Sequence, residues 1–75
     1  MKLKHIILYS IAFTGFTLGI SRGYLALWQD GQPEPLQIYS LPATSLPEAD
    51  QALLRNGIKA ETVAELTSLL EDFLS

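Results

Sequence analysis

Few side chains in this sequence could support catalysis, and they do not form an arrangement that chemistry requires. The single histidine, His5, lies between a short basic stretch and an apolar stretch. A serine nucleophile needs a base within hydrogen-bond reach, and no later histidine could serve one. Acidic pairs occur as Glu48 with Asp50 and as Glu71 with Asp72, but neighbours one or two positions apart diverge on a helix. We therefore expect no catalytic residues, and we interpret both pairs as solvated helix surface.

Metal, cofactor and nucleic-acid binding have equally little support. Zinc sites depend on clustered cysteine and histidine, whereas this chain has no cysteine and one histidine. Asp30-Gly31 lacks the acidic ligand ladder of a calcium loop, and no glycine-rich phosphate loop occurs. Residues 23–75 carry eight acidic and two basic side chains, whereas phosphate contacts need clustered lysine and arginine. We expect no metal, no cofactor and no nucleic acid.

The first 22 residues have the pattern of an export segment. Two lysines precede an uncharged stretch, Ile6–Ile20, and Arg22 follows it. As a helix this stretch would be about 22 Å long, shorter than the ~30 Å hydrocarbon core. Three interpretations stay open: an uncleaved anchor in a thinned bilayer, a signal peptide cleaved after Ser21, and a longer span or buried helix. In the anchored form residues 6–20 contact the membrane, the N-terminus is cytoplasmic and the remainder lies outside the cytoplasm. In the cleaved form the remainder is secreted.

Two strands are predicted next. Tyr24–Gln29 is rich in aromatic and aliphatic residues and leads into Asp30-Gly31, which is typical of a strand that enters a turn. Leu36–Tyr39 predicts a second strand, and Leu41-Pro42 is expected to leave the sheet. We expect the two strands to pair antiparallel, although two strands alone are barely stable without a helix across them.

Two helices are predicted after the strands. The first covers Leu46–Arg55 and the second runs from Val63 to Phe73, both with apolar side chains at helical spacing. Between them, Ile58–Ala60 could add a very short edge strand. Capping signals accompany both helices. The predicted capping residues are Ser45 with Glu48 and Thr62 with Glu65 at the helix starts, and Gly57 at the end of the first helix.

These patterns predict an α+β fold: an N-terminal hydrophobic helix, then a small antiparallel sheet of two or three short strands packed by two helices. The expected division is an export segment over residues 1–22 and an extracytoplasmic domain over residues 23–75. So short a chain buries a thin core, so we expect support from a partner, from the membrane or from self-association. Tyr24 and Trp28 would share one face of the first strand and are the predicted partner contact; core packing of Trp28 is the alternative.

The second half of the chain carries the stretches SLPEADQALLRNGI and ELTSLLEDFLS. They resemble the C-terminal domain of the bypass-of-forespore C family of spore-forming Firmicutes. GYLALWQ, over residues 23–29, is similar to a strand of that family through Gly23, Ala26 and Trp28. In the family a further strand precedes the position of Gly23, where this chain has its apolar segment. The matching positions of the second half are Ser45, Leu46, Pro47, Glu48, Asp50, Leu53, Gly57, Ile58, Glu65, Leu66, Leu69, Leu70, Glu71, Asp72 and Ser75.

The resemblance implies an exported α+β module; the larger sporulation regulator of the family restrains a signalling protease. We therefore expect a non-catalytic, membrane-anchored or secreted regulatory module that binds another exported or membrane protein, with a sporulation role implied by the resemblance. The alternative is a small integral-membrane subunit whose N-terminal helix makes the functional contact.

Overall fold

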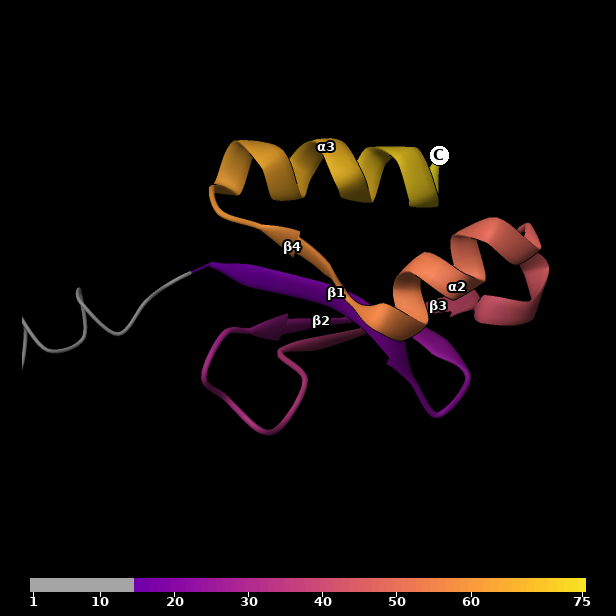
Figure 1. Cartoon of the computed structure of the whole chain (residues 1–75), viewed down its shortest axis with the longest axis horizontal. Helices are drawn as coiled ribbons and strands as arrows, with labels where there is room; N and C mark the ends of the chain where they lie inside the picture. Colours follow the sequence, from indigo (N-terminus) through magenta and orange to yellow (C-terminus); the bar gives the residue numbers. More distant parts are fainter. Residues whose placement is uncertain (1–14) are drawn as a thin grey trace, which may run out of the picture.

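The protein combines a four-stranded antiparallel sheet with two helices, which confirms the predicted α+β class (Figure 1). The computed structural model describes residues 15–75. The strands lie side by side in the order β3-β2-β1-β4. In chain order the elements are β1 (Phe16–Ser21), β2 (Tyr24–Gln29), β3 (Gln37–Pro42), the 3₁₀ turn η1 (Ala43–Ser45), α2 (Glu48–Asn56), β4 (Ile58–Ala60) and α3 (Val63–Leu74).

A tight hairpin joins β1 to β2 and sets the register of the sheet. Leu18 lies opposite Leu27, and the two strands pair along their whole length. Arg22 and Gly23 form the two-residue turn with φ of 54° and 86°. Two successive positive φ angles are what a type I′ hairpin turn requires, and its twist matches that of the flanking strands.

The predicted N-terminal hydrophobic helix is wrong within the described residues. Phe16–Ser21 form β1, although Ile6–Ile20 was expected to be helical. Side chains that alternate along a strand let this segment pair with the equally apolar β2, and Leu18 becomes fully buried. The rest of the predicted helix, residues 6–14, lies outside the described residues. The expected domain boundary between residues 22 and 23 falls inside the hairpin turn.

The other strands follow the prediction more closely. β2 and β4 coincide with the predicted strands, and β1, which was not predicted, brings the sheet to four strands instead of two or three. β3 extends to Pro42, although Leu41-Pro42 was expected to leave the sheet. Pro42 is tolerated because it ends an edge strand, where its missing N–H interrupts no ladder. A bulge shifts the register, since Tyr24 faces Pro42 whereas Ala26 faces Ile38.

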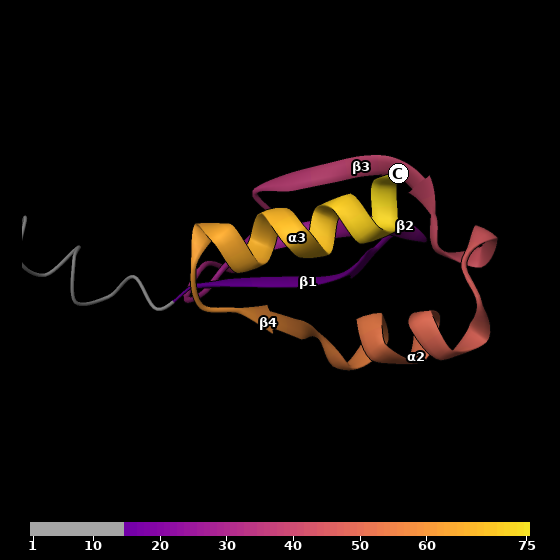
Figure 2. The same cartoon turned by 90° about the horizontal axis from the view of Figure 1, so that it is seen from above.

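The helices cover one face of the sheet and one of its edges. Seen from above, α3 lies over the sheet (Figure 2). α2, which leads into the start of β4, lies at the edge of the sheet beside β1. Leu66 of α3 and Leu54 of α2 join the core that Leu18, Leu25 and Leu27 form on that face. Within residues 15–75, no helix has the length and apolar character needed to cross a membrane.

Only one of the two predicted capping boxes forms. At α3 the backbone N–H of Glu65 donates to Oγ1 of Thr62 at 3.1 Å, and the Glu65 carboxylate accepts from the N–H of Glu61 at 2.8 Å. At α2 the N-cap is Pro47, which has no side-chain cap, and Glu48 is the first helical residue. Ser45 ends η1 and its hydroxyl donates to the carbonyl of Pro42 at 2.7 Å.

The two capping sites differ because of the backbone between Ser45 and α2. Leu46 and Pro47 are both extended, with ψ of 156° and 152°, so they carry Ser45 away from the helix start. Gly57 ends α2 as predicted: its φ is 89°, a region that favours glycine, and its N–H donates to the carbonyl of Leu54 at 3.1 Å.

The two caps predict unequal costs of substitution. Thr62→Ala should lower the free energy of unfolding by about 1 kcal/mol, because the first turn of α3 loses its side-chain acceptor. Ser45→Ala should cost only a few tenths of a kcal/mol, because its exposed hydrogen bond caps no helix. Urea unfolding of the full chain measures both. Equal costs, or a larger cost for Ser45→Ala, would contradict the assignment of the caps.

Candidate functional site

No helix lies over β2 and β3 on the face of the sheet opposite α3, among the described elements, and we call this face the open face (Figures 1 and 2). The end of α2 approaches it only at Gly19 of β1. Cross-strand pairing fixes its composition, because residues that lie opposite each other in neighbouring strands point to the same face. Its side chains are Thr17, Ser21, Tyr24, Ala26, Trp28, Ile38, Pro42 and Lys59, with Gly19 among them.

The predicted contact residues Tyr24 and Trp28 both lie on the open face, with Ala26 between them along β2. Tyr24 keeps 42% of its surface exposed, whereas Trp28 is half-buried. Ile38 of β3 lies opposite Ala26 and is 45% exposed. The sequence did not identify Ile38 as a contact residue. It predicted a strand over Leu36–Tyr39 but not the register in which that strand pairs with β2.

Trp28 is seated on a glycine of the adjacent strand. A Cβ added to Gly19 would lie 3.1 Å from Cζ3 of the indole and 3.4 Å from the carbonyl oxygen of Leu54. Glycine therefore lets the ring approach the backbone of β1 closely, and Trp28 is half-buried without belonging to the core. A glycine inside a strand is often the sign of such a close approach, and aromatic side chains commonly cover it.

A shallow hollow adjoins Tyr24 where β2 and β3 separate at the bulge. Its volume is about 400 Å³, and its lining is partly apolar and partly polar. Burial raises the pKa of the Tyr39 hydroxyl, which keeps this group protonated and a poor base at neutral pH. The lining residues are Tyr24, Ile38, Tyr39, Ser40 and Pro42.

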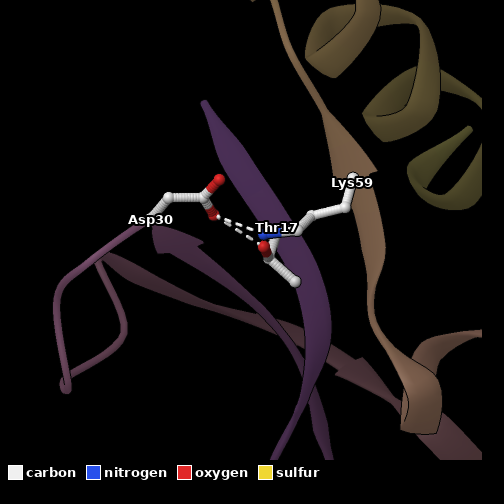
Figure 3. A network of polar contacts seen from close by, with 3 residues as sticks. All are labelled: Thr17, Asp30 and Lys59. Carbon is white, nitrogen blue, oxygen red and sulfur yellow. Dashed lines mark hydrogen bonds and ion pairs between the residues drawn. The ribbon is translucent and has the colours of Figure 1, made fainter. Parts of the chain in front are cut away.

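A polar network crosses the opposite end of the open face (Figure 3). The hydroxyl of Thr17 donates to Oδ1 of Asp30 at 2.7 Å, and Nζ of Lys59 lies 3.1 Å from the same oxygen. Thr17 lies in β1, Asp30 directly follows β2, and Lys59 lies in β4. Asp30, expected only as part of a turn, thus ties three strands together.

The described residues offer contact surface and no cluster suited to chemistry. Within residues 15–75 no group of three or more histidine, aspartate or glutamate side chains could hold a metal, and every buried side chain is apolar. The acidic pairs at Glu48 and Asp50 and at Glu71 and Asp72 lie on helix surfaces, where three of the four side chains are exposed. His5 lies outside the described residues.

Comparison of the chain with protein-family models, with curated proteins and with solved structures found no match. The resemblance to the bypass-of-forespore C family thus stays a prediction from the residues that carry it.

The close contact of Trp28 with Gly19 predicts that a side chain at position 19 lowers stability and changes the tryptophan fluorescence. Gly19→Val should lower the free energy of unfolding by about 1–3 kcal/mol, because the new side chain overlaps the indole. Because the chain has one tryptophan, its fluorescence emission should shift to the red as the ring becomes hydrated. Ser21→Val, on the same face of the same strand, is the control and should change neither property. Similar responses of the two variants would contradict the contact.

The polar network predicts that Thr17 contributes more than Lys59. Thr17→Val should cost about 1–2 kcal/mol, because it removes a hydrogen bond to a charged and largely buried carboxylate. Lys59→Met should cost about 0.5 kcal/mol or less, because the lysine side chain is 66% exposed and water screens the pair. Urea unfolding at low and high salt measures both costs, and only the Lys59 effect should fall as salt rises. A larger effect of Lys59→Met would overturn this ranking.

Proposed function

We propose that this chain is a non-catalytic interaction module that binds another protein through the open face. The observation that carries the proposal is that α3 packs on one face of the sheet, whereas the other face exposes Tyr24 and Ile38 to solvent. Aromatic and aliphatic side chains held on paired strands lose little conformational entropy on binding, which favours a specific contact.

The composition of the open face supports this proposal. Its apolar side chains Tyr24, Trp28 and Ile38 lie along β2 and β3, and the polar side chains Thr17 and Ser21 of β1 lie beside them. Protein interfaces commonly combine an apolar centre rich in tyrosine and tryptophan with a polar rim. The exposures favour Tyr24 and Ile38 as the side chains that contact the partner, with Trp28 supporting them from its seat on Gly19.

We further propose that the partner is an exported or membrane protein in a sporulation-related process. Lys2 and Lys4, followed by the uncharged residues 6–14, support export of the chain. The family resemblance supports the regulatory role, and β1 supplies a strand before Gly23, which the family also has.

The alternative, a small integral-membrane subunit, places the functional contact in the N-terminal segment. Its basis is the run of nine uncharged residues at positions 6–14. The two proposals differ in whether the open face or that segment selects the partner.

A photo-crosslinking amino acid placed in the full chain in its native host distinguishes them. Substitutions at Tyr24 and at Ile38 should give an adduct with one defined protein other than a second copy of this chain, because both positions would touch the partner. Matched substitutions at Thr67 and at Glu71, which are exposed on α3, should not. Mass spectrometry of the adduct should identify an exported or membrane protein.

Replacement of residues 1–14 by an unrelated signal anchor gives the second comparison. The adduct from Tyr24 should persist, because the open face lies within residues 15–75. Loss of the adduct would favour the integral-membrane alternative. Adducts from all four positions, or from none, would overturn the open-face proposal, and an adduct with a cytoplasmic protein would overturn export.

A further inference from the structure

The outer edge of β3 is open for pairing. β3 is the last strand of the sheet on its side, and the view from above shows no other described element beyond it (Figure 2). Its backbone bonds with β2, and among the described residues the groups of Gln37–Leu41 that point away from β2 have no partner. A row of unpaired N–H and C=O groups is a template for another strand.

The usual protection of such an edge is missing from β3. Residues 36–47 contain no charged side chain, and the only proline inside β3 is its last residue. Lysine, proline and inward-pointing charges normally prevent edge-to-edge pairing. Here Ile38, 45% exposed, lies on the edge instead.

The charges of the chain favour a second copy along this edge. Residues 15–75 carry eight acidic and three basic side chains, so two copies repel each other over most of their surface. Both helices carry exposed carboxylates, and Glu61 directly follows β4 at the other edge of the sheet. The uncharged β3 edge is where two copies would meet with the least repulsion.

Two unpaired charges lie where a two-fold axis would bring them together. Antiparallel pairing of β3 with β3 of a second copy places the start of one strand beside the end of the other. Glu34 lies just before β3, and Arg22 lies in the turn beside its end, where the N–H of Ala43 donates to the carbonyl of Gly23 at 2.8 Å. Neither Arg22 nor Glu34 has an ion-pair partner among the described residues.

We propose that two copies of this chain associate through antiparallel pairing of their β3 strands, with Arg22 of each copy directed toward Glu34 of the other. The result is a continuous eight-stranded sheet. Because the two-fold axis is perpendicular to the sheet, both open faces lie on the same side and present two Tyr24–Trp28 surfaces together. This association goes beyond the proposed function and does not depend on it.

Site-specific crosslinking of the full chain tests the pairing. The chain has no cysteine, so Ser40→Cys introduces a single thiol near the middle of β3, and Thr67→Cys places one on α3 as a control. A short bismaleimide should link two copies through Ser40→Cys and not through Thr67→Cys. Adding Ile38→Lys should abolish the product, because it places like charges across the axis. Leu74→Lys is the matched control, with the same 45% exposure at the end of α3, and should leave the product unchanged.

A charge exchange tests the arrangement even if Ile38→Lys impairs folding. Arg22→Asp alone and Glu34→Lys alone should each weaken dimerisation about tenfold, because each replaces two attractions by two repulsions. The two substitutions together should restore it. A monomer at all concentrations would overturn the proposal. So would a dimer that is indifferent to Ile38→Lys and gives no Ser40→Cys crosslink, or a Ser40→Cys crosslink to a different protein.

Discussion

The fold depends on one layer of leucine packing between the sheet and its helices. Leu18, Leu25 and Leu54 are fully buried, and Leu66 of α3 completes the cluster. Burial of such side chains is the main favourable term available to a chain with no disulfide. With one long helix over the sheet and a shorter one beside it, the chain covers one face and one edge. Among residues 15–75, therefore, nothing covers β2 and β3 on the second face or pairs with the outer edge of β3, and both proposals follow from these two surfaces.

Small residues on the open face reduce how much of its large side chains is exposed to solvent. Ala26 and Gly19 lie at its centre, and the indole of Trp28 rests across the glycine. This arrangement buries apolar surface without a covering helix and divides the remaining exposed surface between Tyr24 and Ile38. A face that carried three large exposed side chains side by side would be a stronger aggregation liability in a free monomer. The open face therefore keeps apolar surface for a partner without exposing its largest side chain in full.

Much of the second half could be predicted because its signals are local. Thr62 and Glu65 lie next to the turn that they cap, and Gly57 ends α2 through its own backbone. Ser45 shows the limit of such reasoning. The same capping pattern does not form a cap there, because Ser45 ends η1 and two extended residues separate it from α2. The residue types in the pattern do not indicate this backbone conformation. The position of Ile38 and the ion pair of Asp30 with Lys59 depend on strand order, which a single sequence leaves open.

The largest error concerns a segment whose composition suits two environments. Residues 16–20 are uncharged and apolar, so hydropathy alone assigns them to a membrane helix as readily as to a buried strand. The decisive features are the turn at Arg22-Gly23 and the matching strand after it, which let β1 pair with β2 along its whole length, while β4 pairs with its first half.

This assignment constrains the export prediction in physical terms. Cleavage after Ser21 would remove β1, the strand that joins β2 to β4, together with the fully buried Leu18. The described fold therefore requires residues 16–21 to stay attached. A helical anchor that leaves β1 intact has nine uncharged residues, 6–14, and would be about 14 Å long, roughly half of the ~30 Å hydrocarbon core. An anchor of the predicted length and the four-stranded sheet compete for residues 16–20, so one chain cannot have both at the same time.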